Sequence, residues 1–220
     1  MDNKMQQRVG LFGGTFDPIH FGHLRAAEEI KQILELDKVY FIPTAISPHK
    51  VDTNATPSSK RLEMLKLAIE GNKYFDLSEF ELKSETPSYT IKTLEYFSKM
   101  EPAPELYFIV GNEQFDQIDT WRDYKRLFEL SNFAVITRPG FSELSSSKVP
   151  LALKDDFRYY NCIENVISYT NKRKEIVFIE IKGIEISSTD IRAFVKSKKS
   201  IKYLVPDKVQ KFILSEKLYA

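Results

Sequence analysis

The chain has little cysteine, little histidine and no long apolar run: one Cys, one Trp and three His occur among 220 residues. A lone Cys162 cannot form an internal disulfide, and its neighbours include no histidine, so we interpret it as a buried structural thiol rather than a nucleophile. Histidines spaced by three also give no structural zinc pattern. Because no apolar segment reaches membrane-spanning length and no signal-like segment begins the chain, we expect a cytoplasmic protein with no membrane partner.

Charge of one sign is also lacking. The 32 Lys and Arg nearly balance the 31 Asp and Glu, which leaves a formal net charge of +1. The overall field therefore gives no reason to expect a nucleic-acid partner, and polyphosphate would have to be attracted by locally placed cations. With 42% hydrophobic residues, residues 1–220 are enough for one domain with one core. The oligomeric state stays open, and a homo-oligomer is compatible with the sequence.

Strand-like and helix-like segments alternate along most of the chain. We expect strands near 8–13, 38–42, 74–82, 105–110, 132–137 and 175–181, and helices near 22–35, 58–71, 89–100, 113–129, 188–196 and 206–216. This alternation predicts an α/β fold, a Rossmann-like doubly wound parallel sheet with helices on both faces. Residues 141–174 break the pattern and are interpreted as an insertion, and 186–220 as a helical C-terminal part.

A glycine-rich turn lies between the first expected strand and helix. Gly13 and Gly14 let the backbone turn and approach a ligand closely. His20 and His23 stand at the start of the helix, where free N–H groups and the helix dipole favour an anion, and their spacing places two ring donors about one turn apart. The alternative is a helix cap and a surface residue. The turn nevertheless predicts a phosphate site, whose order we expect Asp17 to support through an Asx bond to the backbone.

The third histidine, His49, follows the second expected strand. Loops after successive parallel strands open at the same sheet edge, so we expect His49 to lie near His20 and His23. Its neighbour Lys50 can offer an ammonium group to polyphosphate, although a loop lysine in isolation is usually a solvated surface group.

A second helix start lies near the C-terminus, where Ser187, Ser188 and Thr189 precede or open the helix expected at 188–196. Hydroxyls there are ordinary caps as readily as anion ligands. Arg192 is placed unfavourably for the helix dipole, and a bound anion would resolve this conflict.

Three further positions are candidates for a second ligand. Ser88 is a plausible N-cap of the helix that begins near 89. Trp121 stands among polar residues, which weakens its interpretation as a core residue. Arg138 ends the fifth expected strand, where it could reach a phosphate.

The segment Gly13-Gly14-Thr15-Phe16-Asp17-Pro18-Ile19-His20-Phe21-Gly22-His23 resembles the signature of the (His/Thr)-x-Gly-His nucleotidyltransferases. Over nearly the whole chain, the sequence is similar to the bacterial nicotinate mononucleotide adenylyltransferases. The segments that carry this resemblance are Pro48-His49-Lys50, Arg61-Leu62-Glu63-Met64-Leu65, Pro87-Ser88-Tyr89-Thr90-Ile91, Trp121, Arg138-Pro139-Gly140, Ile186-Ser187-Ser188-Thr189-Asp190-Ile191-Arg192 and Tyr203-Leu204-Val205-Pro206-Asp207.

The resemblance implies adenylyl transfer from ATP, with Mg²⁺ bound through its phosphates, to nicotinate mononucleotide. It implies that His20, His23, Lys50 and Arg192 are catalytic. Contacts to ATP are implied for Gly13, Gly14, Thr15, Phe16, His20, His23, Gly111, Ser187, Ser188, Thr189 and Arg192. Contacts to the second substrate are implied for His49, Lys50, Ser88, Tyr89, Thr90, Glu113, Trp121 and Arg138, with main-chain groups near Tyr89 and Thr90 at the nicotinate carboxylate and Trp121 stacked on the pyridine ring.

One position departs from the family pattern. Where the family usually has Gly-x-Asp, this chain has Gly111-Asn112-Glu113, so the acidic group expected near the ribose is longer by one methylene. Three alternatives stay open: transfer to nicotinamide mononucleotide, transfer to phosphopantetheine, and a non-catalytic nucleotide-binding protein with the same fold.

Overall fold

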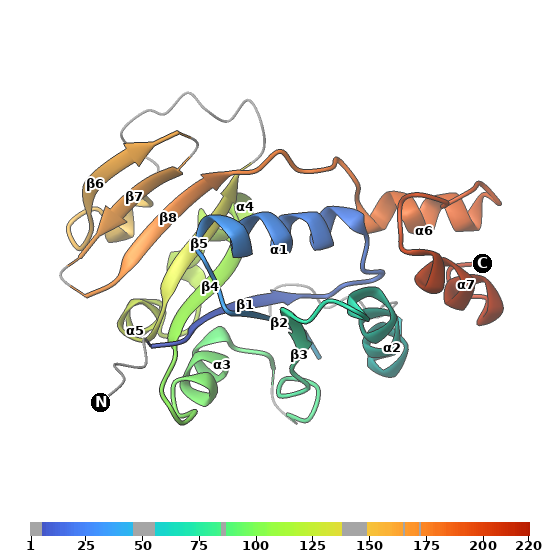
Figure 1. The fold of residues 1–220 in the computed structure, drawn as a ribbon, viewed down its shortest axis with the longest axis horizontal. Coiled ribbons are helices and arrows are strands. Elements are labelled where there is room, and N and C mark those ends of the chain that lie inside the picture. Colours follow the sequence, from blue (N-terminus) through green and yellow to red (C-terminus); the bar gives the residue numbers. More distant parts are fainter. Residues whose placement is uncertain (1–5, 46–55, 85–86, 138–148, 165, 172) are drawn as a thin grey trace. The chain divides into compact units, whose positions relative to one another are not determined.

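A computed structural model describes residues 6–45, 56–84, 87–137, 149–164, 166–171 and 173–220 (Figure 1). The strands of its eight-stranded sheet follow the order β3-β2-β1-β4-β5-β8-β7-β6. Their bounds are β1 Arg8–Gly14, β2 Lys38–Pro43, β3 Phe75–Leu77, β4 Glu105–Gly111, β5 Asn132–Thr137, β6 Arg158–Ile163, β7 Val166–Thr170 and β8 Glu175–Glu180. The strand pairs β1/β4, β4/β5 and β5/β8 are parallel, which confirms the α/β class.

Helices follow most of the strands. Their bounds are α1 Phe21–Ile33, α2 Ser58–Ile69, α3 Thr90–Phe97, α4 Asn112–Phe115, α5 Tyr124–Leu130, α6 Ser188–Lys196 and α7 Asp207–Ser215, with 3₁₀ turns at Ile118–Thr120 and Leu151–Leu153. Within the described part of the chain, none is long and apolar enough to cross a membrane. The single helix expected at 113–129 is wrong. Asp123 adopts a left-handed φ of 53° just before α5, a conformation that cannot continue a right-handed helix.

The chain divides into two compact units, and the division passes through β1, β2 and α1. The first unit comprises 1–12, 29–39 and 89–182, and the second comprises 13–28, 40–88 and 183–220. The expectation of one domain over 1–220 stays a prediction, and each unit is described by itself below.

The first unit has its core on strands β4, β5 and β8. Phe133, Phe178 and Phe115 are almost completely buried, and Phe133 lies 5.6 Å from Phe108 and 4.5 Å from Phe128 between ring centroids. Strands buried on both faces read as continuous apolar runs, as Phe133 to Val135 do here. Burial of each such ring contributes about 2 to 3 kcal/mol relative to exposure, so these strands form a stable base for the loops at their ends.

Residues 141–174 contain the part of the sheet that the sequence did not predict. Strands β6 and β7 form an antiparallel hairpin that continues the sheet from β8. Strand β6 is the edge strand, and its side chains are mostly exposed. Cys162 is exposed there, as are most side chains of this strand, so its interpretation as a buried thiol is wrong.

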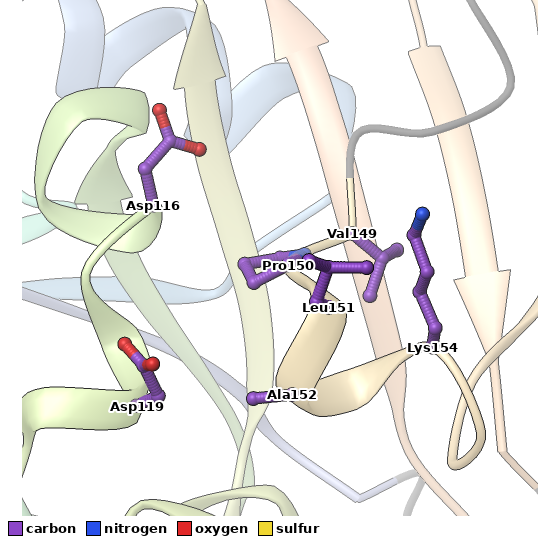
Figure 2. Close-up of a pocket in the computed structure, with 7 residues that line it drawn as sticks. All are labelled: Asp116, Asp119, Val149, Pro150, Leu151, Ala152 and Lys154. Atoms are coloured by element: carbon purple, nitrogen blue, oxygen red, sulfur yellow. The ribbon is translucent and has the colours of Figure 1, made fainter.

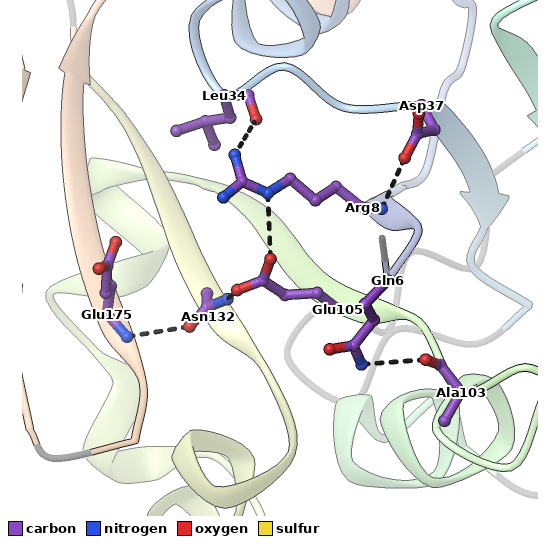
Figure 3. Close-up of polar contacts among 8 residues, drawn as sticks. All are labelled: Gln6, Arg8, Leu34, Asp37, Ala103, Glu105, Asn132 and Glu175. Carbon is purple, nitrogen blue, oxygen red and sulfur yellow. Dashed lines mark hydrogen bonds and ion pairs between the residues drawn. The ribbon is translucent and has the colours of Figure 1, made fainter. Parts of the chain in front are cut away.

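A polar network joins the starts of four strands in the first unit (Figure 3). Arg8 Nε donates to Glu105 at 3.1 Å, and the Asn132 amide donates to Glu105 at 3.3 Å. Asn132 Oδ1 accepts the Glu175 N–H at 3.0 Å. The network lies at the amino ends of β1, β4, β5 and β8, away from the carboxyl edge where ligands bind in such sheets, so we assign it to stability.

Candidate active site

The two imidazoles of the glycine-rich turn come together in the second unit. The main-chain oxygen of His20 accepts the Leu24 N–H at 3.2 Å, which places His20 at the start of α1. The rings of His20 and His23 stack with centroids 3.7 Å apart. The main-chain N–H of His23 donates to the ring nitrogen Nδ1 of His20 at 3.3 Å. Because Nδ1 accepts, a neutral His20 carries its proton on Nε2. The turn therefore presents His20 as a donor with a fixed tautomer.

Burial keeps both rings neutral. The side chain of His20 is 5% exposed, and this burial lowers its pKa from 6.5 to about 4. Burial, followed by the charge of the neighbouring His20, lowers the pKa of His23 well below 6.5. Loss of hydration disfavours the charged imidazolium, so at neutral pH the site offers two N–H groups without positive charge.

Two glycines of this segment have close neighbours at the place where a side chain would begin. A Cβ on Gly14 would lie 2.9 Å from the Phe16 ring, and one on Gly22 would lie 3.0 Å from the His20 ring. The ring of Phe16 in turn lies edge-on to His23, 5.1 Å between centroids. The absence of side chains at 14 and 22 therefore lets the aromatic and imidazole rings pack against the turn.

The start of α6 lies against the same turn. Ser187 is the N-cap and accepts the Asp190 N–H at 3.0 Å. Ser188 Oγ donates to the Pro18 carbonyl at 2.9 Å, and Arg192 donates to the Asp17 carbonyl at 2.6 Å and to Thr189 Oγ1 at 3.3 Å. The structure thus brings the two expected phosphate segments together, within one compact unit.

Asp17 orders the turn through residues far along the chain. One of its carboxylate oxygens accepts the Thr56 N–H at 3.1 Å and the other accepts the Tyr219 hydroxyl at 2.6 Å. Asp17 thus has a structural role in the turn, but through Thr56 and Tyr219, and the Asx bond expected for it stays a prediction.

Arg61 is a second organiser that the sequence reasoning missed. It is 2% exposed and donates to the carbonyls of Thr15, Thr44 and Thr56 at 2.7, 2.9 and 3.0 Å. The sequence did indicate that Arg61 is buried, because helical spacing places it on the same face as Met64 and Leu65. This is the buried face of α2. Tyr219 stands outside any periodic pattern and gave no signal.

The aromatic candidates lie in the first unit. Trp121 is half-buried and packs edge-on against Phe108, 6.0 Å between centroids. The guanidinium of Arg122 lies over the Tyr89 ring at 4.9 Å, a cation–π distance.

The remaining candidates are placed as follows. Tyr89 is the N-cap residue of α3 and Thr90 its first residue, so the expectation that Ser88 caps this helix is wrong. Ser88 Oγ instead accepts the Ala45 N–H at 3.2 Å. Gly111 ends β4, and Glu113 is exposed in the first turn of α4. The candidates His49, Lys50 and Arg138 lie outside the described residues.

The first unit contains a cavity of about 330 Å³ that is lined by other residues than these candidates (Figure 2). Asp116 and Asp119 line one side, and residues 149–152 with Lys154 line the other. It contains no residue that the sequence assigned to a ligand.

Comparison with known proteins first defines the class. The family model described as cytidylyltransferase-like matches residues 11–194, a range that includes both helix starts. The fold agrees with that of a Plasmodium falciparum nicotinic acid mononucleotide adenylyltransferase solved in complex with NaAD, with a TM-score of 0.71, 19% identity and 97% of each chain covered. The sheet and its class are therefore those of nucleotidyltransferases.

Relatives with higher sequence identity indicate which nucleotidyltransferase family the chain belongs to. A Desulfitobacterium hafniense protein named probable nicotinate-nucleotide adenylyltransferase is 39% identical over 217 residues, which cover 99% of this chain and 98% of the relative. A Clostridium botulinum protein of the same name is 38% identical over 212 residues, with 95% and 97% covered. The chain belongs to the nicotinate-nucleotide adenylyltransferase family.

Proposed function

We propose that this enzyme transfers the adenylyl group of ATP to nicotinate mononucleotide, a step of NAD biosynthesis. A phosphate oxygen of the mononucleotide attacks the α-phosphorus, the bond from that phosphorus to the bridging oxygen breaks, and pyrophosphate leaves with nicotinate adenine dinucleotide as the product. The observation that carries the proposal is the pair of neutral, stacked imidazoles at the start of α1, on a turn whose Asp17 carbonyl accepts from Arg192, in a chain of this family.

The second unit supplies the groups proposed for the triphosphate. His20 and His23 donate to phosphate oxygens, and Arg192 compensates charge that develops on the departing pyrophosphate. Main-chain groups of 13–16 approach the phosphates, with the main-chain N–H groups of Ser188 and Thr189 at the second helix start, since the Ser188 hydroxyl donates to the Pro18 carbonyl. The Ser187 hydroxyl is used in its cap, so we assign it the role of fixing that helix start. Such a site works by positioning and by electrostatics, with no covalent enzyme intermediate.

His49 and Lys50 are proposed to contact the phosphates from the segment that follows β2 in the sequence. Mg²⁺ bound to ATP would neutralise part of the triphosphate charge. The described residues include no group of three or more His, Cys, Asp or Glu that could hold a metal ion.

The acceptor is proposed to bind through residues of other elements. Trp121 offers a half-buried ring to the pyridine, and main-chain groups near Tyr89 and Thr90 at the start of α3 suit a carboxylate. We propose Ser88, Gly111, Glu113 and Arg138 as further contacts to the nucleotides. A cytoplasmic location is proposed with this function, because both substrates are metabolites of the cell interior.

The proposal is tested by incubating the purified protein with ATP, Mg²⁺ and nicotinate mononucleotide and measuring pyrophosphate and the dinucleotide together. Equimolar formation of both supports adenylyl transfer. Pyrophosphate without the dinucleotide would indicate hydrolysis of ATP, and neither product would overturn the proposal.

A further inference from the structure

The last residues of the chain close on the glycine-rich turn. The hydroxyl of Tyr219 donates to Asp17 Oδ1 at 2.6 Å, and the other carboxylate oxygen accepts the Thr56 N–H at 3.1 Å. Asp17 is only 6% exposed. A buried carboxylate needs such donors, and two of them from segments distant in sequence fix its orientation. Among the described residues, Tyr219 is therefore one of the donors that hold the side chain of Asp17.

The backbone conformation after α7 positions Tyr219 beside Asp17. The Leu218 N–H donates to the Ile213 carbonyl at 3.0 Å and the Lys217 N–H to the Leu214 carbonyl at 3.3 Å, the two bonds of a Schellman motif. Tyr219 itself adopts a φ of 66°, which is uncommon for a bulky residue and persists only where surrounding contacts hold it. The tail is thus a defined structure rather than a frayed end.

Helix α7 is also anchored to the helix that carries Arg61. Lys60 of α2 pairs with Glu216, and Lys208 pairs with Glu70 at 2.6 Å. Helix α2 supports the turn directly, because Arg61 donates to the Thr15 carbonyl. It also supports the turn indirectly, because it is paired with α7, which precedes Tyr219.

Asp17 connects Tyr219 to the start of α6, which carries Arg192. Its main-chain oxygen accepts from Arg192 at 2.6 Å, so the peptide that Tyr219 holds by its side chain also orients the guanidinium. We propose that Tyr219 is a positioning residue for ATP binding: its hydroxyl holds Asp17, and Asp17 holds Arg192 and the turn in the geometry that receives the triphosphate. Burial, followed by Asp17, raises the pKa of Tyr219 well above 10, so the hydroxyl remains a donor at neutral pH.

The inference rests on the proposed function in that ATP is its ligand, and it is tested with Tyr219→Phe, which removes only the hydroxyl. The matched control is Tyr203→Phe, a change at a tyrosine of the C-terminal segment that is 75% exposed. We expect the Kd of MgATP, measured by calorimetry, to rise about tenfold in Tyr219→Phe, the size of a lost hydrogen bond to a charged group. The KM for ATP should rise in parallel, while Tyr203→Phe binds and turns over as the wild type does.

A lower unfolding midpoint with an unchanged Kd would mean a merely structural role and would overturn the inference. Asp17→Asn provides the second variant: its weaker, neutral acceptor predicts that Tyr219→Phe costs less in that background than in the wild type. Equal costs in both backgrounds would contradict the proposed connection. If Tyr219→Phe weakens MgATP binding but the wild type forms no dinucleotide, only the proposed function fails; if the enzyme is active and the variant binds ATP normally, only this inference fails.

Discussion

At the scale of single residues, the proposed chemistry depends on two imidazoles, His20 and His23, that burial keeps neutral. A neutral ring can donate a hydrogen bond to a phosphate oxygen. A charged ring would form a strong ion pair, which would also slow the release of pyrophosphate. The bond from the His23 main-chain N–H to His20 Nδ1 fixes the donor atom of His20, and the stack of the two rings fixes their orientation, before ATP arrives. Preorganised donors of this kind are effective because they need no rearrangement during the reaction.

Replacing His23 by alanine should therefore affect turnover far more than folding. We expect His23→Ala to lower kcat by about 100-fold or more, the range seen when one preorganised donor is removed. The protein still folds, with a urea midpoint lowered by the lost packing of this ring against His20 and Phe16. Both quantities are measured on the same preparation. A folded His23→Ala protein with near wild-type turnover would remove His23 from the mechanism.

The same burial makes stability depend on pH. The pKa of His20 is about 4 in the folded protein against 6.5 as its ordinary value, so the unfolded chain binds more protons between these values. Stability is fully present above about pH 6.5 and is lost as the pH falls toward 4, by about 3 kcal/mol for this residue. Urea unfolding at pH 7.5 and 5 should show a smaller loss in His20→Asn than in the wild type; an identical loss would contradict the assignment.

At the scale of elements, sequence periodicity predicted the central strands and most helix starts, because apolar runs and caps are local signals. It failed where a tertiary contact or an unusual backbone angle decides the outcome. The helix expected at 113–129 breaks before α5 at the left-handed Asp123. The hairpin β6–β7 was missed because β6 is exposed, so it has no alternating apolar pattern.

The candidate site followed the same division. The histidine pair and the Ser187–Arg192 segment were predicted, because glycines and cap residues mark helix starts locally. Arg61 and Tyr219 were not predicted as organisers of the turn, since their roles depend on carbonyl and carboxylate partners more than 40 residues away along the chain in the bonds to Thr15 and Asp17.

The strand starts give a stability prediction separate from activity. Asn132 is 2% exposed and bridges Glu105 and the Glu175 N–H, as Figure 3 shows. Asn132→Ala leaves these groups without that partner and should lower the free energy of unfolding by about 1 to 3 kcal/mol. Asn161→Ala on the edge strand is the control, with a loss within about 0.5 kcal/mol. The kcat/KM of both folded variants should equal that of the wild type; a selective loss in Asn132→Ala would place the network in the mechanism.

At the scale of the whole molecule, the family indicates adenylyl transfer, while the proposed choice of acceptor depends on a few groups near Tyr89, Thr90 and Trp121. Nicotinate and nicotinamide mononucleotides differ only in a carboxylate against an amide. A site built around donors to a carboxylate would leave them imperfectly paired by the amide, and such mismatches are costly when buried. Phosphopantetheine, which has no pyridine ring, would leave the proposed role of Trp121 without a partner.

The most direct test of this account compares kcat/KM for nicotinate mononucleotide and nicotinamide mononucleotide, with ATP and Mg²⁺ held constant and pyrophosphate release as the readout. The account predicts a preference for the acid of about 100-fold or more, as expected for a site that pairs with the distinguishing group. Equal values would contradict the carboxylate site at the start of α3, and no release with either acceptor would contradict the proposed transfer itself.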